Sequence, residues 1–327
     1  MHFSRRTRKA LLNFFVFVCI STAIGGFISL LRLNNPLRGA FVGFFISATC
    51  GVADGLLFRR LRSLPFTLLL FIKSLFYTLT IISSLLISGV ASFYSPVFYI
   101  LFMLSLFFAA LITFIGQVNR LMGQKVLMHM ISGTYHRPTE EERVIMFLDM
   151  RSSTMAAEKL GNLKFHTLLN RCFYDLTDSI IESGGEIYKY LGDGIIITWN
   201  PSKCFKNATF LTSFFCISEI FKQKSQAYLK EFDYVPSFRA GVHIGLIVIG
   251  ELGDFKKEIA FLGDAVNTTA RIEAECSNKD KSLIVSEDVL NRLTLPTGYI
   301  AENLGNIRLR GKDQYVKLFA IESDEID

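Results

Sequence analysis

Long uninterrupted apolar stretches fill the first third of the chain, and a different pattern follows them. Four such stretches lie at about 11–31, 37–58, 65–90 and 96–118. Each is about as long as the ~20 residues that an α-helix needs to cross the hydrocarbon core of a bilayer. The pattern therefore predicts four transmembrane helices. The first stretch is too long, and too closely followed by the others, to be a cleaved signal peptide.

Basic residues are distributed unevenly around these four stretches. Those on one side of the predicted membrane precede the first stretch, separate the second from the third and follow the fourth: Arg5, Arg6, Arg8, Lys9, Arg59, Arg60, Arg62, Arg120 and Lys125. The opposite side has only Arg32 and Arg38. Because basic residues beside transmembrane helices favour the cytoplasmic side, we expect a multi-pass protein of the cell membrane with both termini in the cytoplasm.

The composition argues against several functional classes for this protein. Half of the 327 residues are apolar, and the excess comes from residues 1–118. The basic flanks of the membrane stretches account for most of the net charge of +6, so no nucleic-acid partner is indicated. The six cysteines include no Cys-x-x-Cys pair, and neither a zinc site nor a disulfide framework is predicted. The four stretches contain no histidine, which argues against a haem-binding membrane anchor.

Two ionisable residues stand inside the apolar stretches, Asp54 in the second and Lys73 in the third. Ionisable residues at membrane depth are functional candidates. We favour a simpler interpretation, in which the long Lys73 side chain reaches the membrane surface. Asp54 would then pair with the basic cluster at 59–62.

Residues 119–131 carry apolar side chains at helical spacing and connect the last membrane stretch to the rest of the chain. They predict a helical linker, which we place at 119–137, between a membrane domain at 1–118 and a second domain at 138–327. Two heptads are too few to predict a coiled coil. No residue pattern in the four stretches identifies a ligand of the membrane domain.

Strand and helix patterns alternate in the second domain. We predict strands at 143–149, 186–191, 195–199 and 238–249, the last broken at Gly241 and Gly245. Helices are predicted at 154–182, 207–229 and 267–276. Shorter elements follow, namely a strand at 283–285, a helix at 287–293 and a hairpin of 308–310 with 316–321. Helices that cross between strands favour an α+β fold with a ferredoxin-like βαββαβ core, behind the all-α bundle of four transmembrane helices.

Two aspartates, Asp149 and Asp193, each follow an apolar run that reads as a strand. A carboxylate at the end of a buried strand is costly unless a cation meets it. Two of them on adjacent strands would make an oxygen site suited to Mg²⁺ and, through it, to phosphates. A helix that opens near Ser152 would offer backbone N–H groups to a phosphate. The alternative is that Asp149 caps a helix and that Gly192-Asp193-Gly194 is an ordinary hairpin turn.

Four sequence blocks stand in a fixed order along this domain. They are FLDMRSST at 147–154, YKYLGDG at 188–194, FLGDAVNTTARIEA at 261–274 and LRGKDQYVKLFAIE at 309–322, the third preceded by the glycine-spaced run RAGVHIGLIVIGELG. In this order and at these spacings they resemble the class III nucleotidyl cyclases, the adenylate and guanylate cyclase family. The resemblance covers about residues 138–321 and implies the ferredoxin-like catalytic domain of that family.

The resemblance implies roles for the first two blocks. Asp149 and Asp193 match the metal-binding aspartates of the family, and the backbone at Met150 matches a segment that also touches a metal. The cofactor implied is Mg²⁺, two ions per site, with Mn²⁺ as a substitute. The segment Ser152, Ser153 and Thr154 matches the phosphate loop.

The resemblance also implies roles on the third and fourth blocks. Asn267 and Arg271, four residues apart on one helix face, match the pair that positions the ribose and neutralises charge in the transition state. Lys312 matches the triphosphate-binding lysine, and Lys189, in the second block, matches the lysine that reads the purine. Taken alone, Arg271 could be a solvated helix charge and Lys312 a turn residue.

The choice of base depends on two positions. Lys189 favours ATP, because cyclases specific for GTP carry an acidic residue there. Ala260 stands where enzymes for ATP tend to carry Asp, Thr or Ser, and its side chain cannot hydrogen-bond. A missing hydrogen-bond partner at such a position weakens discrimination. We therefore expect an adenylate cyclase, and a guanylate or dual-specificity cyclase remains the alternative.

In this family two domains share one active site, and this chain has one cyclase domain with both sets of residues. The resemblance thus implies a homodimer with two equivalent sites, which converts ATP to 3′,5′-cyclic AMP and pyrophosphate by two-metal catalysis. A diguanylate cyclase is disfavoured because its Gly-Gly-Asp-Glu-Phe signature is absent. An inactive membrane receptor with a dimerising cyclase-like domain is the alternative from another class, although the metal aspartates and Arg271 are all present.

Overall fold

The structure is a computed structural model that describes residues 5–33, 35–61, 64–87, 96–122, 133, 135–255, 257–311 and 315–324. The chain divides into two units, Met1–Leu127 and Met128–Asp327. Most of the predicted helical linker, residues 123–132 and 134, and Lys312 lie outside the described residues.

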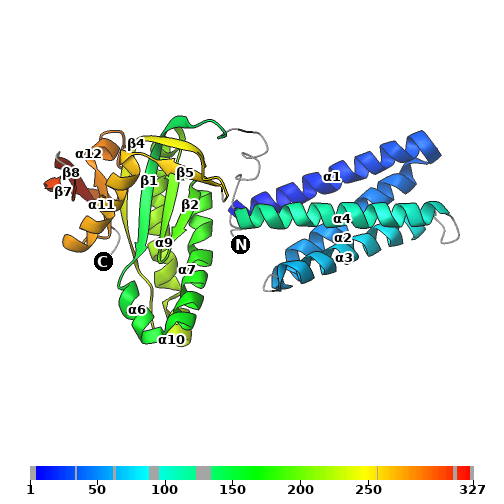
Figure 1. Ribbon diagram of the computed structural model, residues 1–327, viewed down its shortest axis with the longest axis horizontal. Helices are drawn as coiled ribbons and strands as arrows, with labels where there is room; N and C mark the ends of the chain where they lie inside the picture. Colours follow the sequence, from blue (N-terminus) through cyan, green and yellow to red (C-terminus); the bar gives the residue numbers. More distant parts are fainter. Residues whose placement is uncertain are drawn as a thin grey trace. The chain divides into compact units, whose positions relative to one another are not determined.

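The first unit is built of four helices, as predicted (Figure 1). They are α1 (Arg5–Leu33), α2 (Pro36–Arg60), α3 (Phe66–Ile87) and α4 (Pro96–Met122). Three contain stretches that are long and apolar enough to cross a membrane, namely Pro36–Phe58, Phe66–Ile87 and Phe98–Val118. The described part of α1 contributes a shorter apolar stretch, Phe14–Phe27. The helices therefore fit a membrane domain, with at least three candidate spans.

Helices α1 and α2 approach each other through small residues. A Cβ atom added at Gly39 would collide with the backbone of Gly25 and with the Cβ of Ser29, and one at Gly43 would collide with the backbone of Ser21. Close backbone contact through small residues is a common way for membrane helices to associate, because lipid provides no hydrophobic force that drives helices together. The two glycines of α2 thus decide how closely this helix pair packs.

The interpretation of Asp54 and Lys73 from the sequence was wrong. Lys73 Nζ lies 2.5 Å from one carboxylate oxygen of Asp54, and the Tyr77 hydroxyl donates to the other oxygen at 2.6 Å. Lys73 also lies over the ring of Phe58, 4.8 Å from its centroid. Asp54 therefore pairs with α3. The two residues stand 19 positions apart, a separation that helical spacing within one segment cannot reveal.

The second unit contains one sheet of eight strands. The strands are β1 (Thr139–Met150), β2 (Glu186–Leu191), β3 (Gly194–Trp199), β4 (Phe238–Leu252), β5 (Glu258–Leu262), β6 (Leu283–Ser286), β7 (Tyr299–Arg308) and β8 (Tyr315–Ser323). Their order is β2-β3-β1-β4-β6-β8-β7, and β5 pairs with β4. The first four strands are antiparallel neighbours in the order 2-3-1-4. With the helices between them they form the predicted ferredoxin-like βαββαβ core.

Helices cover both faces of this sheet (Figure 1). They are α6 (Ser153–Leu160), α7 (Asn162–Glu182), α8 (Pro201–Cys204), a 3₁₀ turn (Phe205–Asn207), α9 (Thr209–Gln223), α10 (Ser225–Phe232), α11 (Asp264–Asn278) and α12 (Glu287–Leu290). Successive side chains of a strand point to opposite faces. Accordingly Val144, Met146 and Leu148 pack in the core with α7 and α9. Ile145 packs on the other face with Ala265 of α11.

Glycines let α11 lie directly on β4. A Cβ atom at Gly241 would collide with the backbone of Glu273, and one at Gly245 would lie 2.8 Å from the Cβ of Ala265. The sequence-based prediction that β4 breaks at these glycines was wrong, because β4 runs unbroken from Phe238 to Leu252. Here glycine marks a place where a helix approaches the backbone of a strand.

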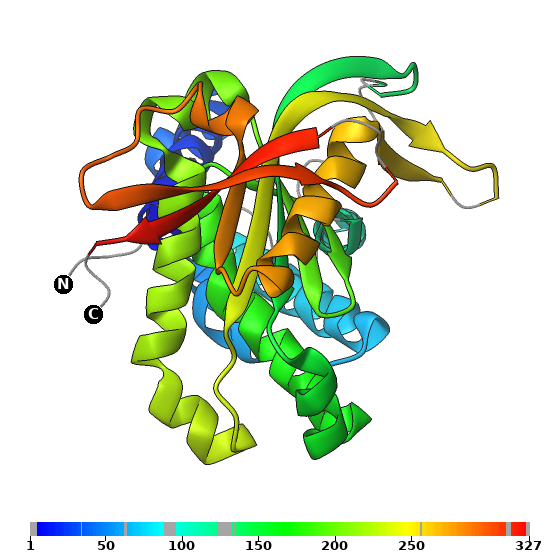
Figure 2. The same ribbon diagram turned by 90° about the vertical axis from the view of Figure 1, so that its left-hand side faces the viewer.

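Other boundaries also differ from the predictions. The helix predicted at 154–182 is two helices, since Gly161, with φ of 72°, ends α6. The helix predicted at 207–229 is also divided, at Lys224. Strand β5 was not predicted. It forms with β4 a long hairpin that extends beyond the rest of the sheet (Figure 2).

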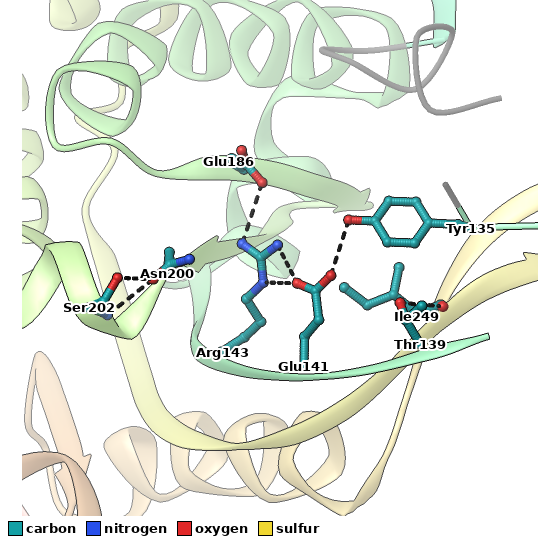
Figure 3. A network of polar contacts seen from close by, with 8 residues as sticks. All are labelled: Tyr135, Thr139, Glu141, Arg143, Glu186, Asn200, Ser202 and Ile249. Atoms are coloured by element: carbon teal, nitrogen blue, oxygen red, sulfur yellow. Dashed lines mark hydrogen bonds and ion pairs between the residues drawn. The ribbon is translucent and has the colours of Figure 1, made fainter. Parts of the chain in front are cut away.

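A polar network fixes the start of β1 (Figure 3). Arg143 donates to Glu141 at 2.7 and 2.9 Å and lies 3.6 Å from Glu186 of β2, while the Tyr135 hydroxyl donates to Glu141 at 3.4 Å. Burial and the charge of Glu141 raise the pKa of Tyr135. The segment that precedes β1 is thereby connected to β2.

Candidate active site

The two aspartates meet at one end of the sheet because of the strand register. Asp149 is the last residue but one of β1 and is paired with Gly194, the first residue of β3. Asp193 stands directly before Gly194, in the two-residue turn between β2 and β3. A Cβ atom at position 194 would lie 3.2 Å from Oδ1 of Asp149, so glycine leaves space beside this carboxylate. Burial and the charge of Asp193 raise the pKa of Asp149.

A network of charged side chains, which the sequence did not reveal, connects Asp149 to α11. Asp149 is also paired with Arg239 of β4. Arg239 donates to Asp149 at 3.0 Å and to Glu273 at 2.6 Å. Burial raises the pKa of Glu273, and the charge of Asp149 adds to this effect. The arginine was missed because its place opposite Asp149 follows from the β1–β4 register, which no local motif records.

These carboxylates suit a divalent cation. Asp149 is partly buried beside another carboxylate, and Arg239, which it shares with Glu273, neutralises it only in part. Met150 is 1 % exposed and belongs to the main core, so its side chain packs in the core and its backbone is the part that could contribute to the site. Within the described part of the chain no cluster of three or more His, Cys, Asp or Glu side chains is arranged for a metal. Two carboxylates supplemented by backbone oxygen form the donor set that fits Mg²⁺ or Mn²⁺.

The predicted phosphate segment leads into α6. Ser152 has a φ of 55°, and its side chain makes no capping hydrogen bond. The helix begins at Ser153, and Ser152 and Thr154 are exposed. The first N–H groups of a helix have no partner within it and carry a partial positive charge. This helix end therefore follows Asp149 by four residues and is open to an anion.

The two predicted base-reading positions lie on neighbouring elements. Lys189 of β2 is half-exposed and lies 3.4 Å from Glu258 of β5. Ala260, also in β5, is 6 % exposed. Between the strands the ring of Tyr188 stacks on that of Phe261, with centroids 3.8 Å apart and planes at 6°. The structure thus places Lys189 beside β5, the strand that carries Ala260 and that the sequence did not predict.

The remaining predicted residues lie on α11 and beyond it. Asn267 is exposed, and Arg271 is partly buried near Gly311, where an added Cβ would lie 3.4 Å from its Nη2 atom. Glu273, which contacts Arg239, stands two residues after Arg271. At 100° per residue the two side chains leave the helix about 200° apart. Arg271 therefore points away from the side of α11 that meets Asp149.

Comparison with known proteins identifies the second unit. Residues 135–323 match the family described as the adenylate and guanylate cyclase catalytic domain. The chain is 34 % identical over 215 residues to adenylate cyclase 2 of Rhizobium meliloti (strain 1021), an alignment that covers 66 % of this chain and 59 % of that protein. It is 28 % identical over 187 residues to the receptor-type guanylate cyclase gcy-6 of Caenorhabditis elegans, covering 55 % of this chain and 17 % of that one.

Solved structures agree on the fold. A bacterial light-regulated adenylyl cyclase superposes with a TM-score of 0.57 at 22 % identity, over 67 % of this chain and 66 % of that one. The chain spans less than two thirds of the length of the curated relatives it matches. The family match covers more than half of the chain, with the four sequence blocks inside it. The chain therefore belongs to the class III nucleotidyl cyclase family.

Proposed function

We propose that this protein is a membrane-bound adenylate cyclase, which converts ATP to 3′,5′-cyclic AMP and pyrophosphate at a site shared by two protomers. The observation that carries the proposal is the pair of carboxylates, Asp149 and Asp193, at one end of the sheet and beside the open start of α6. Lys189 supports ATP as the substrate. The name of the Rhizobium relative, an adenylate cyclase, supports the same choice.

Asp149, Asp193 and the backbone at Met150 would hold the divalent ions. When bound, such ions lower the pKa of the ribose 3′-hydroxyl and neutralise charge on the phosphates. The start of α6, from Ser152 to Thr154, would orient the phosphates through backbone N–H groups. Arg239 keeps Asp149 in place through its hydrogen bond and takes up part of the charge of Asp149 and Glu273.

Residues of α11 and its neighbours would complete the site. Asn267 would hold the ribose so that its 3′-hydroxyl faces the α-phosphorus. Arg271 would donate to oxygens on which charge develops in the transition state, and such interactions raise turnover and not merely affinity. Lys312, in the segment after Gly311, is proposed as the triphosphate contact on the basis of the resemblance.

Turnover of the purified full-length protein tests this function. ATP and GTP are compared, each with Mg²⁺ and with Mn²⁺, and the cyclic product and pyrophosphate are measured. We expect cyclic AMP, with a higher kcat/KM for ATP. A kcat/KM for GTP that is equal or higher would favour the guanylate or dual-specificity alternative, which Ala260 keeps open. No cyclic product from either nucleotide would favour the inactive receptor.

The placement of the two halves of the site supports a homodimer. Arg271 leaves α11 on the side opposite Glu273, the residue that Arg239 connects to Asp149, and this supports a site shared between two protomers. The β4–β5 hairpin carries exposed apolar side chains at Leu246, Leu252 and Leu262, which a second copy would cover. Each of the two sites would take its carboxylates from one protomer and its α11 residues from the other.

The membrane helices would place the catalytic unit at the cytoplasmic face of a lipid bilayer. The uneven basic flanks support a multi-pass arrangement with both termini in the cytoplasm. Reporter fusions at the two ends, together with one in the loop between α1 and α2, test this orientation. Labelling of both ends from the outside of intact cells would contradict it.

We also propose that the membrane unit regulates the cyclase through the linker. Helix α4 ends at Met122, and the polar network that leads to β2 begins at Tyr135. The connection is short, and Glu186 stands three residues before Lys189. Insertions are best placed after Met122, because Gln117 is buried within α4. Adding one to four residues would rotate a helical linker by about 100° each, and we expect activity to vary with rotation. Constant activity would leave the membrane unit as an anchor.

A further inference from the structure

A lysine and a glutamate form an ion pair at the rim of the proposed purine site. Lys189 Nζ lies 3.4 Å from Glu258 Oε1, and the side chains are 44 % and 47 % exposed. An exposed pair of this kind contributes little to stability. Ala260, two residues after Glu258 on the same strand, is buried and has no polar side-chain atom. Since residues i and i+2 of a strand share a face, Glu258 is the carboxylate on the face of Ala260.

The strands that carry this pair are firmly connected. The ring of Tyr188 stacks on the ring of Phe261, and its hydroxyl oxygen accepts the N–H of Phe261 at 2.9 Å. Each of these residues is within three positions of the ion pair. Burial of the stacked rings fixes the backbones, while the polar ends of Lys189 and Glu258 remain open to a ligand. A donor and an acceptor are therefore held side by side before any nucleotide binds.

The chemistry of this pair matches one edge of adenine. Adenine presents N1, an acceptor, next to its 6-amino group, a donor. An ammonium group and a carboxylate 3.4 Å apart can meet these two neighbouring groups at once. Guanine bound in the same position would turn its O6 acceptor toward the carboxylate, and the two acceptors would repel each other.

We propose that Glu258 is a specificity-determining residue, which accepts a hydrogen bond from the 6-amino group of adenine while Lys189 donates to N1. Glu258 thus supplies the acceptor that Ala260 lacks. The inference rests on the proposed function, since it assigns the base-reading group of that same site. Hydrogen bonds to charged groups are among the stronger ones, so loss of this bond costs about 10- to 100-fold in discrimination.

The test compares two substrates on the full-length protein. One is ATP, and the other is purine riboside 5′-triphosphate, which differs from ATP only by the absence of the 6-amino group. We expect the wild type to prefer ATP by about 10- to 100-fold in kcat/KM. Glu258→Ala should lower the kcat/KM for ATP by this factor and leave the kcat/KM for the analogue unchanged. If Glu258 acted only by restraining Lys189, the variant would change the kcat/KM for both substrates equally. The preference for ATP would then persist, which would overturn the proposal.

Glu251→Ala is the matched control, because Glu251 lies on the same hairpin and pairs with Lys257 at 3.2 Å. It should retain the full preference for ATP. The 3′-deoxy forms of both nucleotides lack the attacking hydroxyl, so their binding measures base reading without turnover. If Glu258→Ala abolishes preferential binding of the adenine nucleotide, the inference is supported, even where ATP is not cyclised. Absence of cyclisation would contradict the proposed function alone. Preferential binding that survives Glu258→Ala would overturn the inference alone.

Discussion

The two sides of α11 differ in what they contact, although the helix is one short, regular element. One side is tied into the protomer, since Glu273 shares Arg239 with Asp149 and packs its backbone on Gly241. The other side carries Asn267, which is exposed, and Arg271, whose described neighbour is Gly311. One side positions the carboxylates, and the other presents polar groups outward.

In the proposed dimer, this difference would let the sequence block at 261–274 serve two sites and not one. The glutamate of the block supports the carboxylates of its own protomer. The asparagine and arginine of the same block would contact a nucleotide held by another protomer. A single helix can serve both because residues two positions apart point in nearly opposite directions.

The largest effect is expected from the carboxylate side. Asp149→Asn keeps the size of the side chain but removes the charge that would hold a divalent ion, so activity should fall by about 10³-fold or more. Initial rates of cyclic nucleotide formation measure this. Asp233→Asn, which changes an exposed carboxylate paired with Lys159, should retain activity. If Asp149→Asn kept more than a tenth of the activity, the metal role of Asp149 would have to be abandoned.

The outward side should respond in a different way. Arg271→Ala is expected to lower kcat by about 10²- to 10³-fold with little change in KM, because the charge it meets develops only in the transition state. Steady-state kinetics with ATP separate the two constants. A rise in KM at unchanged kcat would instead assign Arg271 to ground-state binding. Thermal stability should stay close to that of the wild type, in contrast to Glu273→Ala, which leaves Arg239 without one of its two partners.

A smaller effect, on thermal stability, is expected from Mg²⁺ binding and from pH. Mg²⁺ at about 100 times its Kd should raise the Tm by roughly 5–10 °C, and Asp149→Asn should abolish most of this rise. Burial and Asp193 raise the pKa of Asp149, so a proton competes with the metal at a higher pH than for an ordinary aspartate. The Mg²⁺-dependent rise should therefore shrink as the pH falls through that raised pKa.

Without metal, the stability of the folded state should instead fall as the pH rises. A carboxyl whose pKa is raised in the folded state contributes stability at pH values below its ordinary pKa, and this contribution is lost as the pH rises through the raised value. Metal-free wild type should thus lose stability relative to Asp149→Asn over that range. Differential scanning calorimetry with a chelator, from pH 4 to pH 8, measures the difference. Parallel curves for the two proteins would show that the folded state does not raise this pKa.

The fold was largely predictable from the sequence because the core elements have strong periodic patterns. The four apolar helices and most of the core strands follow from them, but β7 lies at Tyr299–Arg308 and not at the predicted 308–310. Strand β5 was missed because it is short: its apolar run, Ile259–Leu262, has four residues, and periodicity alone cannot assign so short a run to a strand. The division of the helix at 154–182 depends on one glycine, Gly161, which a helix interior can also accommodate.

The residues of the candidate site that lie in local motifs could be predicted from the sequence. Those that are brought to the site by strand register could not. Asp149 and Asp193 each lie in a recognisable block, and the antiparallel β1–β3 pairing brings the blocks together. Arg239 and Glu258 lie outside the motif positions assigned from the resemblance, and their partners are 90 and 69 residues away in the chain. The pairing of Asp54 with Lys73 was missed because it depends on how α2 packs against α3, which no local motif records.

Mixed dimers test the central claim, that each site combines the carboxylates of one protomer with the outward side of α11 from another. Asp149→Asn and Arg271→Ala are co-expressed with different affinity tags, and the heterodimer is purified through both tags. Each homodimer should be inactive. In the heterodimer one site holds both lesions and the other holds none, so about half of the wild-type activity per dimer is expected. A heterodimer of verified composition that is as inactive as its parents would show that Asp149 and Arg271 serve the same half-site, and would contradict the account.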